Sequence, residues 1–355
     1  MKEKRLITIL TGLCFFFSLT ALTLDQGIAF AASDKPITLK FAHQNPPKGR
    51  TTVKLIDAYI NKVREVTKGR LEIVVYPAQS LIKAKEMVTG IETGVADMAW
   101  TPLGYFTGRF PLTTVTMLPF MALDTGGKNS LVLQELFETL PEVKREYRSV
   151  KMLSLHASDA YHVFTSKTPV RTLEDIKGLK LRIMGAYPIM ASKRLGLSPL
   201  FMPMPGVYEA GEKGVLDGAA LPWAAVATFN LFEVYPYWTN VDLWSAPFMI
   251  FMNKDKWDSL PKDIQEAIES VSNMNAARWL GDAAWGPVVK DETLAKAGKA
   301  GKKLEMISLA PGELEKWKAI AGPPVWDSWV EEMNKKGLPG KKVLEAAEKL
   351  MKKYQ

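Results

Sequence analysis

The sequence predicts an α/β protein of two domains with a ligand cleft between them. Its 355 residues are enough for two domains of roughly 150 residues each. Strand and helix patterns alternate in the first part of the chain and again further on, which is typical of open sheets covered by helices. Sheets of this kind bind ligands at the carboxyl ends of their strands, so we expect the site in the cleft.

The N-terminus has the pattern of a secretory signal peptide. Basic residues open the chain, an apolar run covers residues 6–24, and small residues suit cleavage near Ala31. The only cysteine, Cys14, lies inside this segment, and Leu13 before it does not suit lipid attachment. We therefore expect a soluble periplasmic protein without disulfides or cysteine-ligated metals.

The first predicted domain takes residues 32–156 and about 241–280. Its pattern of alternating strands and helices predicts a mostly parallel sheet covered on both faces. The expected elements are, in order, a strand over 37–43, a helix over 53–63, a strand from Leu71, a helix over 84–91 and a strand over 95–100.

The second predicted domain takes residues 157–240 and about 281–355. A single long helix from Pro261 to residue 280 is expected at the end of the first domain, and a break at Gly286 and Pro287 follows it. A second α/β unit is indicated by strand patterns over 151–157, 161–166, 179–184 and 197–202 and a helix over 187–195.

The net charge of +8 comes partly from lysines near the C-terminus. Val343, Ala347 and Leu350 keep a helical apolar stripe between these lysines, and no aromatic side chain is interleaved for base stacking. We therefore interpret this segment as a solvated helix face, and we expect no nucleic-acid partner.

The segment "IKGLKLRIMG" (176–185) raises the question of what Arg182 does. Apolar and cationic residues alternate in it as in a strand with one buried face. Arg182 lies near the carboxyl end of this strand, where an open α/β sheet binds its ligand. A solvated cation is the alternative.

Two motifs resemble the extracytoplasmic solute-binding proteins of tripartite ATP-independent periplasmic (TRAP) transporters, the DctP family. They are "PVRTLEDIKGLKLRIMG" (169–185) and "VYEAGEKGVLDG" (207–218), and weaker similarity extends over most of the chain. The resemblance implies two α/β domains that are joined by crossing strands and a long helix and that close on an organic acid. It also implies that Arg182 pairs with the ligand carboxylate, and that small and large membrane subunits receive the ligand.

Departures from the family pattern suggest the kind of ligand. Many members carry Gln-Glu-Asn-Pro where this chain has residues 219–222, so Leu221 replaces a polar contact and Trp223 follows it. His162 stands near a position where numerous members have arginine, and Trp100 ends a strand. We expect these four residues to line the cleft around an aromatic or apolar monocarboxylate, although each could instead be a core residue. Tyr105 and Arg109 could either reach the cleft or pin a loop, and we expect them to pin the loop.

The sequence lacks the motifs of common enzymes. The histidines are not spaced as a helical metal pair, and no nucleophile elbow, phosphate loop or dinucleotide fingerprint occurs. We expect no catalysis, no cofactor and no bound metal, and we expect a monomer. A binding protein of a sensor system and, less favoured, a secreted hydrolase are the alternatives.

Overall fold

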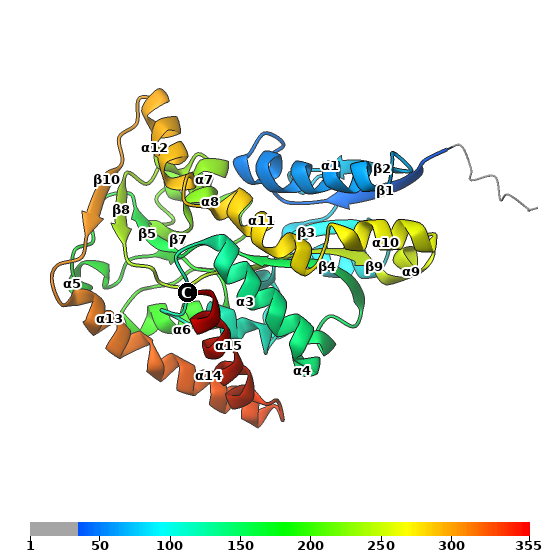
Figure 1. Ribbon diagram of the computed structural model, residues 1–355. Coiled ribbons are helices and arrows are strands. Elements are labelled where there is room, and N and C mark those ends of the chain that lie inside the picture. Colours follow the sequence, from blue (N-terminus) through cyan, green and yellow to red (C-terminus); the bar gives the residue numbers. More distant parts are fainter. Residues whose placement is uncertain (1–34) are drawn as a thin grey trace, which may run out of the picture. The chain divides into compact units, whose positions relative to one another are not determined.

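The computed structural model describes residues 35–355, which Figure 1 colours from blue to red. Residues Pro36–Gln355 form one compact unit. The predicted signal peptide, with its cleavage near Ala31, lies outside the described residues. Within the described part of the chain, no helix is both long and apolar enough to span a bilayer. The unit contains two five-stranded sheets, and we call each sheet with its covering helices a lobe.

The first sheet has the strand order β2-β1-β3-β9-β4. Strands β1, β2 and β3 pair in parallel, as the sequence pattern predicts. Strand β9 pairs antiparallel with both β3 and β4, so the first sheet is mixed. The prediction of mostly parallel pairing is therefore wrong for the part of the sheet formed by β3, β9 and β4. The strands are β1 (Ile37–Ala42), β2 (Leu71–Tyr76), β3 (Met98–Pro102), β4 (Val150–Ala157) and β9 (Pro247–Asn253).

Strand β9 is the centre of this lobe. All seven of its residues are buried, because the strand has neighbours on both edges and helices on both faces. Such a strand appears in a sequence as a continuous apolar run, without the alternation that reveals a half-exposed strand. The strand pattern over 151–157 was described with the second unit, although the predicted boundary after residue 156 places almost all of it in the first domain. It joins the first sheet because β9 returns to pair with it.

The second sheet has the order β10-β8-β5-β7-β6. The predicted strand over 197–202 does not form, since this segment contributes only an isolated bridge between Leu200 and Arg182. The strands are β5 (His162–Thr165), β6 (Leu181–Arg182), β7 (Gly218–Leu221), β8 (Tyr237–Asn240) and β10 (Glu305–Ser308).

Helices cover both sheets, and most of them are short. The first part of the chain forms α1 (Asp57–Val66), α2 (Met87–Glu92), α3 (Gly126–Thr139) and α4 (Pro141–Arg145). The middle part forms α5 (Leu173–Ile176), α6 (Ala186–Arg194), α7 (Val207–Glu212), α8 (Trp223–Thr228), α9 (Lys254–Asp258) and α10 (Lys262–Ser270). The last part forms α11 (Met274–Trp285), α12 (Val289–Lys299), α13 (Glu313–Ala321), α14 (Pro323–Lys335) and α15 (Gly340–Tyr354). Single turns are η1 (Thr52–Ile56), η2 (Ala84–Glu86), η3 (Leu103–Tyr105), η4 (Thr113–Met117), η5 (Met204–Gly206) and η6 (Leu231–Glu233).

The long helix predicted from Pro261 is two helices, α10 and α11. The chain breaks at Asn273, whose φ of 53° is incompatible with a continuing right-handed helix. The amide nitrogen of Asn273 donates to the carbonyl oxygen of Leu153 in β4 at 2.6 Å. The backbone thus leaves the helix in order to bond to the sheet, which helical periodicity alone does not reveal. The predicted break at Gly286 and Pro287 is present between α11 and α12.

Four chain segments connect the lobes within residues 35–355, and the fourth is the link from α13 and α14 to α15 on the first lobe. The segment between β4 and β5 lies beside the segment between β8 and β9, because Tyr161 N donates to Trp244 O (2.8 Å) and Leu243 N donates to Tyr161 O (2.9 Å). The third connection follows α11, which packs on both α3 and α8 and runs across the centre of Figure 1. The predicted domain boundaries stay a prediction.

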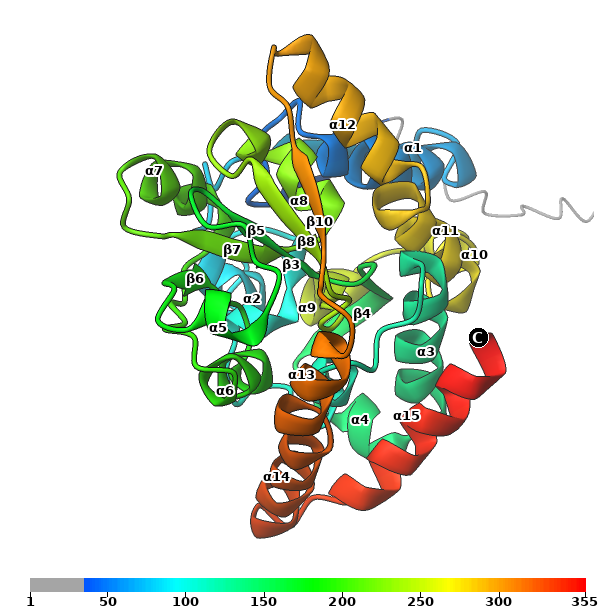
Figure 2. The ribbon, with the colours of Figure 1, turned by 90° about the vertical axis from the view of Figure 1, so that its left-hand side faces the viewer.

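The C-terminal helix is fastened to the first lobe. Helix α15 packs along α3, as Figure 2 shows from the side. Its Lys342 and Lys353 pair with Glu142 and Glu135, each at 2.7 Å. The hydrogen bond from Lys342 holds the pKa of Glu142 below its usual value. Part of the predicted solvated lysine face therefore binds acidic residues of the same molecule.

Gly218 permits the closest backbone approach in the second sheet. A Cβ atom at this position would lie 2.1 Å from the carbonyl oxygen of Phe164, on the neighbouring strand. We expect Gly218→Ala to lower the free energy of unfolding by roughly 3 kcal/mol, because overpacking forces the strands apart. Gly206→Ala is the control, since the nearest atom would be 3.9 Å away. Urea unfolding of both variants tests this, and equal stabilities would contradict it.

Candidate functional site

Arg182 lies at the end of the short strand β6, with only 1% of its surface exposed. Its Nε donates to the carbonyl oxygen of Met202 at 3.0 Å. Its Nη2 has no hydrogen-bond partner, and no carboxylate among residues 35–355 forms an ion pair with it. Burying a cation without a counter-ion costs several kcal/mol. The site therefore has an unsatisfied positive charge that an anion can complete.

Two tyrosines from different elements line the same cavity as this guanidinium. Tyr161 lies on the connection between β4 and β5, and burial raises the pKa of its phenol, an effect that the adjacent Arg182 partly opposes. Tyr105, in η3, accepts a hydrogen bond from the amide nitrogen of Met204 at 2.9 Å. Both phenols are buried. The bond between Tyr105 and Met204 also joins the first lobe to the second beside Arg182.

An aromatic wall faces the same space from the first lobe. Trp100 in β3 stacks on Phe248 in β9, with ring centroids 5.1 Å apart, and Phe248 stacks on Trp285 at 4.6 Å. Trp100 Nε1 donates to His156 Nε2 at 2.9 Å, which fixes the orientation of the indole. Three flat side chains from three elements thus form one rigid apolar surface.

A cavity of about 30 Å³ lies between the aromatic wall and Arg182. Arg182 is its only charged lining residue within the described chain. The other lining residues are Gln44, Asn45, Thr51, Trp100, Pro102, Tyr105, Tyr161, Met184, Met204, Pro222, Ala225, Phe229, Phe248 and Trp285. Both lobes contribute to this lining, so a ligand here would touch both.

A larger groove of about 670 Å³ lies elsewhere, along β4 and the loop that follows α4. It is wide open. Of its four basic lining residues, Lys151 already pairs with Glu269, and Lys144, Arg145 and Arg148 are exposed to solvent. Because no buried charge without a partner lies in it, we place the candidate site at the smaller cavity.

The structure brings two of the predicted site residues, Arg182 and Trp100, to the cavity. The other three, His162, Leu221 and Trp223, lie within the second lobe and are absent from the lining. His162 and Leu221 face each other across β5 and β7. Their neighbours Pro222 and Ala225 reach the cavity instead.

Trp223 belongs to an aromatic cluster of the second lobe. Its ring packs edge-to-face on Trp238 at 4.4 Å and on Phe164 at 5.2 Å. His162 lies beside this cluster, and its Nδ1 is 3.5 Å from an oxygen of Asp242. Burial and the positive charge of Lys290 lower the pKa of His162 to about 3, so we regard the imidazole as neutral and the contact as weak.

Sequence reasoning missed several lining residues. Phe248 lies in a strand that we did not predict, and Trp285 directly precedes the Gly-Pro break that we did predict. Tyr105 was expected to pin a loop, and its hydroxyl reaches across to the second lobe. The adjacent break could have indicated Trp285, because the last residue of a crossing helix lies between the lobes.

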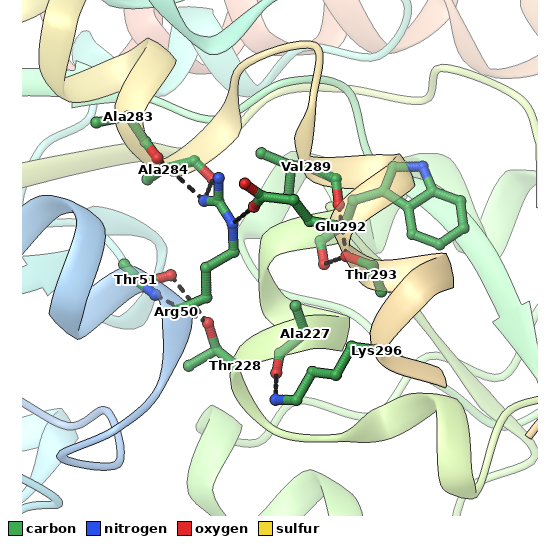
Figure 3. Close-up of polar contacts among 11 residues, drawn as sticks. Arg50, Thr51, Ala227, Thr228, Ala283, Ala284, Val289, Glu292, Thr293 and Lys296 are labelled. Carbon is green, nitrogen blue, oxygen red and sulfur yellow. Dashed lines mark hydrogen bonds and ion pairs between the residues drawn. The ribbon is translucent and has the colours of Figure 1, made fainter. Parts of the chain in front are cut away.

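A second set of contacts joins the lobes beside the cavity (Figure 3). Arg50 Nη1 donates to the carbonyl oxygens of Ala283 (3.0 Å) and Ala284 (2.6 Å) in the last turn of α11. Its Nε pairs with Glu292 on α12 at 2.6 Å. A cation at this end of a helix is favourable, because the last carbonyl groups lack partners within the helix.

Thr51 and Thr228 extend this set toward the cavity. Their hydroxyl oxygens are 3.0 Å apart, and the amide nitrogen of Thr51 donates to Thr228 Oγ1 at 3.2 Å. Thr51 itself lines the cavity. The lobes are therefore hydrogen-bonded on two sides of the cavity, here and at Tyr105.

A family of known proteins shares this architecture. Residues 41–332 match the family model of bacterial extracellular solute-binding proteins, family 7, called DctP. The chain belongs to this family. The match confirms the predicted resemblance to TRAP solute-binding proteins.

Individual relatives agree with this assignment. The DctP-family chain is 29% identical to the 2,3-diketo-L-gulonate-binding periplasmic protein YiaO of Escherichia coli, over 59% of this chain and 63% of that one. A TRAP solute-binding protein from Rhodoferax ferrireducens, in complex with copurified benzoate, superimposes with a TM-score of 0.84 at 28% identity, covering 90% of this chain and 98% of that chain. A marine metagenome protein specific for aromatic acids, in complex with metahydroxyphenylacetate, gives 0.84 at 29% identity, covering 90% and 99%. The two-domain fold that we predicted is confirmed.

His156 makes the stability of this DctP-family protein depend on pH. Burial lowers its pKa to about 3, whereas in the unfolded chain the imidazole binds a proton below about pH 6.5. Between these values the unfolded state binds more protons, so stability falls as the pH falls through this window. From pH 7.5 to 5 this residue alone accounts for a loss of about 2 kcal/mol.

The variant His156→Gln tests this effect, because glutamine keeps an acceptor for Trp100 Nε1 and cannot titrate. We expect its free energy of unfolding to decrease by about 2 kcal/mol less than that of the wild type between pH 7.5 and 5. Urea unfolding at the two pH values measures the difference. The same decrease in both proteins would contradict a neutral, buried His156.

Proposed function

We propose that this chain captures an aromatic monocarboxylate between its lobes and delivers it to the membrane subunits of a TRAP transporter. The observation that carries the proposal is the buried guanidinium of Arg182, whose Nη2 lacks a partner, in a cavity with an aromatic wall. The family supplies the role of an extracellular solute-binding protein.

The charge of the cavity favours a monoanion. Arg182 is the one charged residue in the described lining, so a single carboxylate neutralises it. A second carboxylate would enter without a cation, and an unpaired buried charge is strongly unfavourable. The planar guanidinium also forms two parallel hydrogen bonds with a carboxylate, which orients the ligand.

The aromatic wall favours a flat, apolar body behind that carboxylate. Trp100 and Phe248 are stacked with an interplanar angle of 13°, and a ring that packs on them adds stacking energy to apolar burial. A sugar acid would bring several hydroxyl groups against these rings, and each one left without a partner costs ~1–3 kcal/mol.

The remaining predicted residues are assigned supporting roles. We propose that Leu221 and Trp223 act from behind the lining, where their packing in the second lobe fixes Pro222 and Ala225. His162 supports the same cluster from β5. The proposal further includes export by a signal peptide cleaved near Ala31, a small and a large membrane subunit, a monomeric state and binding without turnover.

We expect Arg182→Met to weaken binding of benzoate by ~2–5 kcal/mol, because the carboxylate would lose its buried partner. Isothermal titration calorimetry measures this change. The same variant should retain the thermal stability of the ligand-free wild type, since it removes a buried charge that has no counter-ion. A folded Arg182→Met protein that binds benzoate as tightly as the wild type would disprove the anchor.

We expect the radius of gyration to decrease when benzoate binds, because the ligand contacts both lobes and favours the state in which they are closed. Small-angle X-ray scattering with and without benzoate tests this. Calorimetry on the same sample verifies saturation. Identical radii at saturation would be incompatible with domain closure.

A further inference from the structure

Two amide side chains stand on the loop that follows β1 and line the same cavity. Gln44 and Asn45 are only 3% and 2% exposed. The loop is held in place by its backbone, since Asn45 N donates to His43 Nδ1 (3.2 Å) and Ala78 N donates to Asn45 O (2.9 Å). The position of the two amides is therefore set independently of their side-chain contacts.

These side chains contain buried polar atoms without hydrogen-bond partners. Gln44 Oε1 and Asn45 Nδ2 form no hydrogen bond with any other atom of residues 35–355. Leaving such a group unpaired costs free energy, so buried polar groups are nearly always satisfied. One of the two is an acceptor and the other a donor. Together with Arg182 Nη2, three unpaired polar groups therefore belong to residues that line one cavity.

The chemistry of the two amides differs from that of Arg182. Both are neutral, and the described lining holds no second cation and no carboxylate. A neutral acceptor and a neutral donor on successive lining residues match a hydroxyl group, which donates one hydrogen bond and accepts another. A second carboxylate could not donate to Gln44 Oε1, and an ammonium group could not accept from Asn45 Nδ2.

We propose that the natural ligand is a hydroxylated aromatic monocarboxylate and that Gln44 and Asn45 recognise its hydroxyl group. This inference rests on the proposed function, in which Arg182 binds the carboxylate and the aromatic wall binds the ring. The ligand hydroxyl donates to Gln44 Oε1 and accepts from Asn45 Nδ2. The two amides thereby determine which aromatic acids bind, while Arg182 binds any of them.

A site built to bond a hydroxyl group rejects the analogue that lacks it, because the polar groups of the site then remain unpaired. We expect one hydroxylated isomer to bind about tenfold more tightly than its parent acid. The position of the hydroxyl on the ring should matter, since the anchor at Arg182 and the wall fix the orientation of the ring.

Calorimetry with a series of acids on the full mature chain tests the proposal. The probes are benzoate and its 2-, 3- and 4-hydroxy derivatives, and phenylacetate with its hydroxylated derivatives. The proteins are the wild type, Gln44→Met, Asn45→Leu and the double variant, in which apolar side chains of similar size replace the amides. We expect the preference for the hydroxylated isomer to fall from about tenfold to nearly none in the double variant.

The controls separate this inference from the proposed function. The amide variants should still bind the parent acid, and more tightly than the wild type, because no amide is then left unpaired, whereas Arg182→Met should weaken the binding of every acid in the series. If the wild type binds parent acids through Arg182 but prefers no hydroxylated isomer, the role of the amides is disproved and the proposed function stands. If it binds no acid of the series, both are disproved. A preference that persists in the folded double variant also overturns the role of the amides, and the two single variants provide the comparison should the double variant not fold.

Discussion

The constraint on which the rest of the structure depends is a guanidinium that is held away from water without a counter-ion. Arg182 keeps one hydrogen bond to a backbone carbonyl and otherwise faces phenols, methionines and aromatic rings. A charge in such surroundings is tolerated only where the neighbouring elements are fixed, and here a strand end, a crossing segment and the turn at Tyr105 hold it. Without a ligand, the unpaired buried charge costs the protein free energy of folding. An anion that pairs with Arg182 removes this cost, and the gain strengthens its binding.

Closure and recognition use the same residues. Tyr161 lies on a crossing connection and also beside Arg182, so movement of the connection changes the surroundings of the charge. Tyr105 and Thr51 each line the cavity, and each also bonds to the opposite lobe. Binding and lobe contact are therefore coupled directly, without a separate relay between them.

The sequence was sufficient for the fold class, the family and the position of Arg182, because each depends on local patterns. Strand alternation, a signal-peptide pattern and two motifs are all continuous in the chain. The cleft lining was harder to predict, since it joins a turn after β1, an unrecognised strand and the end of a crossing helix.

Two errors share one physical origin. Strand β9 was not recognised because burial on both faces removes the alternation that marks a strand. The pattern of β4 was described with the second unit, despite a predicted boundary after residue 156, because pairing with β9 is not visible in the residues of β4. Leu221 and Trp223 are apolar and adjacent to the cavity. Which of several neighbouring apolar residues faces a ligand depends on the direction of the strand end, which sequence spacing did not determine.

The position of β9 also has a consequence for how the chain folds. This strand lies between β3 and β4, yet it is made only after the residues of β5, β6, β7 and β8. The first sheet remains incomplete, with unpaired strand edges, until most of the second has been synthesised, and contacts of such long range form slowly. Neither half of the chain, produced alone, would therefore contain all the strands of a complete sheet.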